Sequence, residues 1–216
     1  MIVTIDGPAG SGKSTVARML ADRLQIRYLD TGAMYRAIAL AVVQSEFSES
    51  NDDDVARVAA DSEIEFCGSD IRLNGVNVTN EIRDANVTAV ASVVAANPRV
   101  RARLVEMQQQ IGRSGDLVTE GRDQGTVVFP NAPYKFFVTA SLGRRAQRRH
   151  REMLKRGVKL PLQTVKTQLR QRDERDENRE YAPMKPADDA QVIDTSDMSI
   201  AEVVEVLNAN IQSQAN

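Results

Sequence analysis

The chain has 216 residues, of which 42% are apolar and 27% are charged, so it is long enough to bury a sizeable core. Its net charge of −2 gives no overall indication of a nucleic-acid or membrane partner, and no apolar run approaches the ~20 residues that cross a bilayer. The single cysteine, Cys67, cannot form an internal disulfide, and a core strand follows Met1 directly. We therefore expect a reducing, cytoplasmic setting.

The first fifteen residues organise the chain. A short apolar strand over residues 2–5 leads into a glycine-rich loop and then into residues with the spacing of an amphipathic helix. Such a loop lets successive backbone N–H groups point at one anion, and the helix that follows adds the positive end of its dipole. We expect Lys13 to reach the β- and γ-phosphates of a nucleoside triphosphate and the Ser14 hydroxyl to ligate Mg²⁺. The predicted triphosphate-binding residues are Gly7, Pro8, Ala9, Gly10, Ser11, Gly12, Lys13, Ser14 and Thr15.

A second strand, predicted over residues 26–29, also runs into a helix. Thr31 is the predicted N-cap of that helix, whose buried stripe is Met34, Ile38 and Val42. A strand that meets a helix N-terminus offers a second possible anion site, and Arg36 lies near the first turn of this helix. Asn51 is then a candidate cap for a short helix that follows a polar linker.

Residues 62–84 interrupt the alternation of strands and helices. Their apolar side chains alternate with period two, and turns are predicted at 68–70 and at Asn74-Gly75. We expect a small antiparallel insert here. Helices are predicted to follow over residues 85–96 and 98–111.

The second half of the chain returns to alternation. A strand that ends in a charged turn is predicted over 116–123, and further strands are predicted at 134–139 and 191–195. A capping box, Ser199 with Glu202, opens a last helix. Helices at 142–157 and 163–179 are strongly charged, but the first has no interleaved aromatic residues and the chain is acidic overall, so we expect no nucleic-acid partner. The pattern predicts an α/β fold, a parallel sheet with helices on both faces and ligands at the carboxyl ends of its strands.

Among proteins with such a phosphate loop, two classes fit poorly. The chain has no Asn-Lys-x-Asp sequence to read guanine, and the strand that ends at Glu120 lacks the paired acids of a motor or transporter ATPase. Arginines at loop and helix ends instead favour a second, anionic acceptor, since several cations can stabilise the charge of a transferring phosphoryl group. Two alternatives stay open: a kinase for another nucleoside monophosphate or small metabolite, and a nucleotide-binding switch without an acceptor.

Five segments together resemble bacterial-type cytidylate kinase, a family of P-loop nucleoside monophosphate kinases. They are Gly7-Pro-Ala-Gly-Ser-Gly-Lys-Ser-Thr15, Leu29-Asp-Thr-Gly-Ala-Met-Tyr-Arg-Ala37, Asn97-Pro-Arg-Val-Arg101, Glu120-Gly-Arg-Asp-Gln-Gly-Thr-Val-Val-Phe-Pro130 and Arg172-Asp-Glu-Arg-Asp-Glu-Asn-Arg179. The resemblance implies transfer of the ATP γ-phosphate to CMP or dCMP with Mg²⁺. It also implies a monomer with one kinase domain over residues 1–216, a five-stranded parallel core, the insert at 62–84 in the acceptor-binding region, and a helical lid at about 160–185.

The same resemblance implies roles for individual residues. Acceptor-binding residues would be Thr31, Arg36, Ser92, Arg101, Arg122, Asp123, Arg172, Asp176 and Arg179, with Lys13, Arg122, Arg172 and Arg179 in catalysis. Arg36, Arg122 and Arg179 would hold the acceptor phosphate. Ser92, Arg101 and Asp123 would read the cytosine, and Arg172 and Asp176 would reach the sugar hydroxyls. Arg145 and Arg149 are similar to arginines that contact the ATP donor. Glu120 departs from the family pattern, which often has aspartate there.

Overall fold

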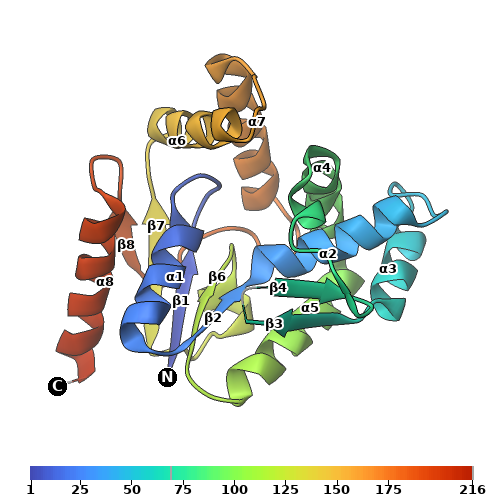
Figure 1. The fold of residues 1–216 in the computed structure, drawn as a ribbon. Helices are drawn as coiled ribbons and strands as arrows, with labels where there is room; N and C mark the ends of the chain where they lie inside the picture. Colours follow the sequence, from blue (N-terminus) through green and yellow to red (C-terminus); the bar gives the residue numbers. More distant parts are fainter. Residues whose placement is uncertain (69, 216) are drawn as a thin grey trace. The chain divides into compact units, whose positions relative to one another are not determined.

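A computed structural model describes residues 1–68 and 70–215. The chain divides into two compact units, one formed by residues 1–29 with 114–216 and the other by residues 30–113 (Figure 1). Within the described residues, no helix combines the length and the apolar character that a bilayer crossing needs.

A five-stranded sheet forms the centre of the first unit. Its strands, in spatial order, are β2 (Arg27–Asp30), β6 (Leu117–Glu120), β1 (Ile2–Asp6), β7 (Tyr134–Thr139) and β8 (Gln191–Asp194). β1 pairs in parallel with both neighbours, Thr4 lying opposite Thr119 on one side and Lys135 on the other. Because the chain winds to either side of β1, a crevice is expected outside the carboxyl end of this strand.

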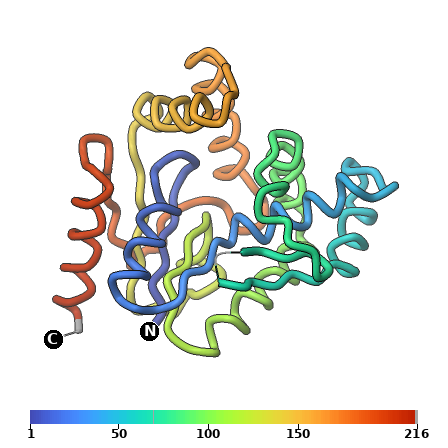
Figure 2. The backbone as a smooth tube through the Cα atoms, viewed as in Figure 1, coloured from blue at the N-terminus to red at the C-terminus, as the bar shows by residue number. Residues whose placement is uncertain are grey.

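Four helices belong to this unit: α1 (Lys13–Leu24), α6 (Leu142–Lys155), α7 (Leu162–Glu177) and α8 (Ile200–Ala215). α1 and α8 pack side by side against the sheet (Figure 1). The core between them includes Val3, Ile5, Val16, Leu20, Val118, Phe136, Val138 and Leu207. α6 and α7 pack against each other on the path from β7 to β8 (Figure 2). A π-helical turn, η2 (Gln124–Val128), follows β6.

The second unit is mainly helical. Its helices are α2 (Thr31–Gln44), α3 (Asp52–Asp61), the short 3₁₀ helix η1 (Glu81–Arg83), α4 (Ala85–Val94) and α5 (Pro98–Arg113). A three-stranded antiparallel sheet contains β3 (Ile64–Cys67), β4 (Asp70–Leu73) and β5 (Val76–Asn77). Asn74 and Gly75 both have positive φ, as a two-residue hairpin turn requires. Ser69, in the predicted turn at 68–70, lies outside the described residues.

These two sheets confirm the predicted fold class, a parallel five-stranded sheet flanked by helices with a small antiparallel insert. Two predicted caps are also confirmed. The Asn51 side chain accepts the N–H groups of Asp53 and Asp54, and Ser199 and Glu202 exchange the two hydrogen bonds of a capping box.

The predicted cap of α2 is wrong by one residue. The N-cap is Asp30, whose Oδ1 accepts the N–H of Ala33 at 2.9 Å, and Thr31 is the first helical residue. Both residue types can cap a helix, but a carboxylate also interacts favourably with the positive helix end. Asp30 retains the extended backbone that the cap position needs.

The glycine-rich loop passes close to β7 at Gly7, and a substitution there tests this close approach. Gly7 has φ of +138°, and a Cβ atom there would lie 2.1 Å from the carbonyl oxygen of Val138. We expect Gly7→Ala to lower the free energy of unfolding by more than about 3 kcal/mol, because both backbone strain and a backbone clash oppose it. Urea unfolding measures the change.

Gly143 in α6 provides the matched control, since nothing lies within 4 Å of the position its Cβ would take. Gly143→Ala should leave stability unchanged or raise it by up to ~1 kcal/mol, as alanine favours the helix. Equal stability of the Gly7→Ala and wild-type proteins would contradict the close approach of loop and strand.

Candidate functional site

Glycines shape the loop between β1 and α1. Gly10 and Gly12 have positive φ values of 77° and 97°, which reverse the chain direction in a short span. Gly12 occupies the N-cap position of α1 and has no side chain with which to accept the first N–H groups of the helix. Backbone donors and helix dipole together make this end of α1 suited to a phosphate group.

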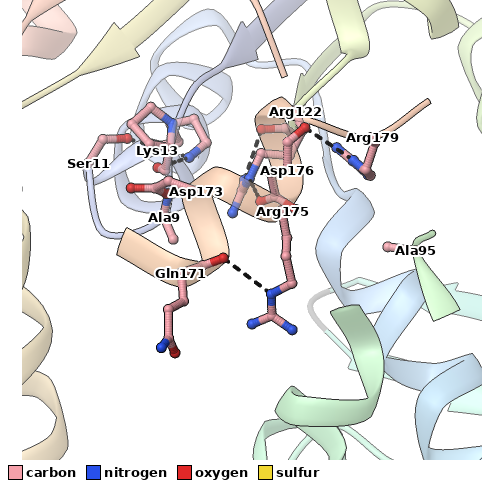
Figure 3. A network of polar contacts seen from close by, with 12 residues as sticks. Ala9, Ser11, Lys13, Ala95, Arg122, Gln171, Asp173, Arg175, Asp176 and Arg179 are labelled. Carbon is pink, nitrogen blue, oxygen red and sulfur yellow. Dashed lines mark hydrogen bonds and ion pairs between the residues drawn. The ribbon is translucent and has the colours of Figure 1, made fainter. Parts of the chain in front are cut away.

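Lys13 folds back into this loop. Its Nζ donates to the carbonyl oxygen of Pro8 at 2.7 Å and to Oγ of Ser11 at 3.4 Å, and the residue is only 4% exposed (Figure 3). The pKa of Lys13 is lowered to about 7, mainly by burial and also by the nearby Arg122 guanidinium, while Glu120 partly opposes the shift. An anion bound in the loop would raise the pKa of Lys13 again and so favour its charged ammonium form.

Two carboxylates stand at the ends of the strands beside Lys13. Asp6 ends β1 and accepts the N–H groups of Gln124 and Gly125, each at 2.8 Å. Burial raises the pKa of Asp6 to about 7, although these two N–H donors lower it in part. Asp6 thereby fixes the turn that follows β6.

Glu120 ends β6, and its Oε1 accepts the hydroxyl proton of Ser14 at 2.8 Å. A hydroxyl and a carboxylate are hard oxygen donors of the kind that Mg²⁺ takes in phosphate sites, where phosphates and water supply the other ligands. Ser14 and Glu120 therefore fit the cation that the sequence predicted. In the part of the chain that the structure describes, no group of three His, Cys, Asp or Glu side chains could hold a metal.

An ion pair joins the turn after β6 to α7. Arg122 Nε donates to Oδ2 of Asp176 at 2.8 Å, and Arg179 Nε donates to the backbone carbonyl of Asp176 at 3.3 Å (Figure 3). Burial raises the pKa of Asp176, but Arg122, Arg172 and Arg179 outweigh it and hold that pKa below its usual value. The structure thus brings Arg122, Arg172, Asp176 and Arg179 together, and Arg122 and Arg172 also act on Lys13.

Asp123 follows Arg122 and is buried, with 4% of its surface exposed. Its backbone carbonyl accepts the N–H of Val127 at 2.9 Å and that of Val128 at 3.2 Å, and the second bond has the spacing of a π-helical turn. Its charge contributes to the raised pKa of Asp6, so the two carboxylates are neighbours. Asp123, the carboxylate predicted to read the base, therefore lies in a turn that is held by backbone hydrogen bonds.

The two arginines predicted on the donor side have different surroundings. Arg145 is buried at the start of α6, pairs with Asp173 and donates to the carbonyl oxygen of Ala9 at 3.1 Å. Arg149 is half-exposed and pairs with Glu152 on its own helix at 3.3 Å. Only Arg145 of the two contacts the phosphate loop in the contacts described.

The remaining predicted residues lie in the second unit. The buried Thr31 starts α2, Arg36 pairs with Asp30 at 3.5 Å, and Ser92 is half-buried on α4. The Nε of Arg36 is buried without a hydrogen-bond partner among the described residues, so one donor is left for a ligand. Arg101 lies over the ring of Tyr35, 5.6 Å from its centre.

Two buried aspartates, Asp6 and Asp173, are not among the predicted site residues. Asp6 carries a charge at the end of an otherwise apolar strand, which is a signal that was present in the sequence. Asp173 stands in a segment crowded with charges, where no local feature distinguishes it from its solvated neighbours.

The pKa of Lys13 generates a prediction about stability. Between pH 7 and pH 10 the unfolded chain holds a proton on this lysine that the folded chain has lost, so the contribution of Lys13 to the free energy of unfolding rises with pH. We expect the free energy of unfolding of the wild type, minus that of Lys13→Met, to increase across this pH range when both are measured by urea unfolding. Lys155→Met, at an exposed lysine, should give a constant difference. A flat difference for Lys13→Met would contradict the lowered pKa.

Comparison with known proteins places the chain in a family. The family model described as cytidylate kinase matches residues 3–213. The chain is 43% identical over 203 residues to a cytidylate kinase of Caldanaerobacter subterraneus subsp. tengcongensis, a match that covers 94% of this chain and 91% of that one. It is 44% identical over 207 residues to a cytidylate kinase of Streptococcus gordonii, with 94% and 92% covered.

A solved structure supports the fold alone. The crystal structure of an uncharacterized protein from Eubacterium ventriosum matches with a TM-score of 0.56 at 13% identity, over 99% of both chains. The nearly full-length family match and the two relatives above 40% identity show that the chain belongs to the cytidylate kinase family, and the phosphate loop with its surrounding charges agrees with this.

Proposed function

We propose that the protein transfers the γ-phosphoryl group of ATP to CMP or dCMP. The observation that carries the proposal is the arrangement of Arg122 and Arg172 beside Lys13, at the carboxyl ends of β1 and β6. A phosphate loop holds one phosphorylated ligand, and the additional guanidinium groups suit a second one. The relatives named cytidylate kinase indicate which acceptor this is.

The proposed step needs no catalytic base. An oxygen of the CMP phosphate is already ionised and attacks the γ-phosphorus, while the bond from that phosphorus to the bridging oxygen of the β-phosphate breaks. The bonding electrons leave with ADP, and CDP or dCDP forms. Lys13, Arg122, Arg172 and Arg179 stabilise the charge that is spread over the transferring group.

Donor and acceptor use different residues in this proposal. The donor is bound by residues 7–15, with Arg145 and Arg149 on its side. The acceptor is bound by Thr31, Arg36, Ser92, Arg101, Arg122, Asp123, Arg172, Asp176 and Arg179. Mg²⁺, held by Ser14 and Glu120, would neutralise phosphate charge when bound.

The proposal also covers the domain organisation, the oligomeric state and the cellular location of the protein. Residues 1–216 act as one kinase domain, in which 62–84 belong to the acceptor-binding part and about 160–185 act as a lid that excludes water from the reaction. The proposed oligomeric state is a monomer. The single cysteine, Cys67, is exposed and free, which supports a reducing, cytoplasmic setting. The relatives named cytidylate kinase support a role in pyrimidine nucleotide metabolism.

An assay of ADP release across CMP, dCMP, UMP, AMP and GMP tests the function. We expect turnover with CMP or dCMP well above the other acceptors. Lys13→Ala should lower kcat about 100-fold or more, because an electrostatic contact to the transferring group is lost. Preference for another acceptor would favour a different kinase. Slow turnover that no monophosphate accelerates would favour a nucleotide-binding switch.

The choice of base gives a separate prediction. Cytosine offers an N4 amino donor where uracil has a carbonyl, so the Asp123 carboxylate would accept from CMP and repel UMP. Asp123→Asn should lower the ratio of kcat/KM for CMP over UMP by about tenfold or more, since one such contact is worth ~1–3 kcal/mol. Asp22→Asn, on the exposed side of α1, is the control. An unchanged ratio would remove Asp123 from base recognition.

A further inference from the structure

Helix α7 carries a second buried aspartate, Asp173, one turn before Asp176. The residue is 6% exposed and is not one of the predicted acceptor-binding residues, although its charge also acts on Arg122. Its Oδ1 accepts the N–H of Ala9, in the phosphate loop, at 3.3 Å. Its Oδ2 pairs with Nη1 of Arg145. Figure 3 shows Asp173 on α7 beside the loop that carries Ala9 and Lys13.

Arg145 reaches the same loop residue. Its Nη1 donates to the carbonyl oxygen of Ala9 at 3.1 Å, and its Nε donates to the carbonyl oxygen of Ala140 at 2.8 Å. The N–H of Ala9 is therefore held by Asp173 and its C=O by Arg145. Both polar backbone groups of one phosphate-loop residue are fixed by a single buried ion pair.

Apolar packing supports the same contact. The methyl group of Ala9 belongs to a small core with Ala146 of α6 and with Val165 and Leu169 of α7. Because Val165, Leu169 and Asp173 follow one another at helical spacing, one face of α7 carries both the apolar and the charged contacts to Ala9. The phosphate loop is thus seated on the helix pair α6 and α7.

Such seating has a consequence for the donor nucleotide. Backbone N–H groups bind a phosphate well only if they already point at it. The N–H and the C=O of Ala9 belong to two successive peptide units, so a hydrogen bond to each restricts the rotation of both units. Charged hydrogen bonds are about twice as strong as neutral ones, and a buried pair tolerates the loss of one partner poorly. The orientation of the loop thus depends on a carboxylate that is distant in sequence.

We propose that Asp173 is a positioning residue for the donor nucleotide, which makes ATP affinity depend on helix α7 through Ala9 and Arg145 and not through any contact with the acceptor. The proposal rests on the proposed function, because it takes ATP as the occupant of the loop. It assigns to α7 two separate tasks, with Asp173 directed at the donor side and Asp176 at the acceptor side.

The experiment compares Asp173→Asn with Asp176→Asn in the full chain. Calorimetry gives the Kd of Mg²⁺–ATP and, separately, of CMP. Asp173→Asn should raise the Kd of ATP about tenfold and leave that of CMP within about twofold, a difference in free energy that partners in one network commonly show. Asp176→Asn should show the reverse pattern. Asp53→Asn, in an exposed ion pair of the second unit, should change neither.

A second variant, Asp173→Glu, tests the proposal if Asp173→Asn does not fold. If Asp173→Asn fails to unfold cooperatively, Asp173→Glu keeps the charge opposite Arg145 and moves the carboxylate by one methylene, and it should raise the Kd of ATP selectively as well. Unchanged ATP affinity in a folded variant would overturn the proposal, and so would equal weakening of ATP and CMP. A wild-type protein that does not phosphorylate CMP would instead refute the proposed function.

Discussion

The burial of Lys13 among other charges is the constraint on which the site depends. Each unit of pKa depression corresponds to about 1.4 kcal/mol of lost preference for the ammonium form, so a pKa of about 7 represents a cost on the order of 5 kcal/mol. This net cost remains although the carboxylates of Glu120 and Asp6 favour the ammonium form, because burial and the charge of Arg122 oppose it more strongly. A triphosphate would bring the missing negative charge, so the site is stabilised most when its ligand is bound.

The order of the strands explains why these charges meet. β1 lies between β6 and β7, so the residues that follow β1 and β6 emerge side by side at one edge of the sheet. Asp6 then connects them, since its two carboxylate oxygens accept N–H groups from the turn after β6. A carboxylate in this place shapes the backbone that carries Arg122 and Asp123, and it also lies near Lys13. Fold and electrostatics are therefore coupled through one side chain.

Features set by neighbouring residues could be predicted from the sequence, whereas contacts between distant segments could not. The Asn51 cap, the Asn74-Gly75 turn and the strand, loop and helix of the first residues depend on local chemistry and were predicted correctly. The cap of α2 was misplaced because Asp30 and Thr31 are both good caps, and only the backbone angles decide between them. Asp6 and Gln124 are 118 residues apart, and Ala9 and Asp173 are 164 apart, so no local pattern joins them.

Helix α7 illustrates how one charged segment can combine solvation with function. Its sequence resembles a salt-bridged surface helix, yet Asp173 and Asp176 are buried and each pairs with an arginine from a different element. Arg145 comes from α6 and also contacts the phosphate loop, whereas Arg122 comes from the turn after β6. The two pairs are almost one helical turn apart, so neighbouring positions of α7 reach different partners. Asp173 holds the phosphate loop, whereas Asp176 holds the turn that carries Arg122, so one helix supports the donor side and the acceptor side through separate contacts.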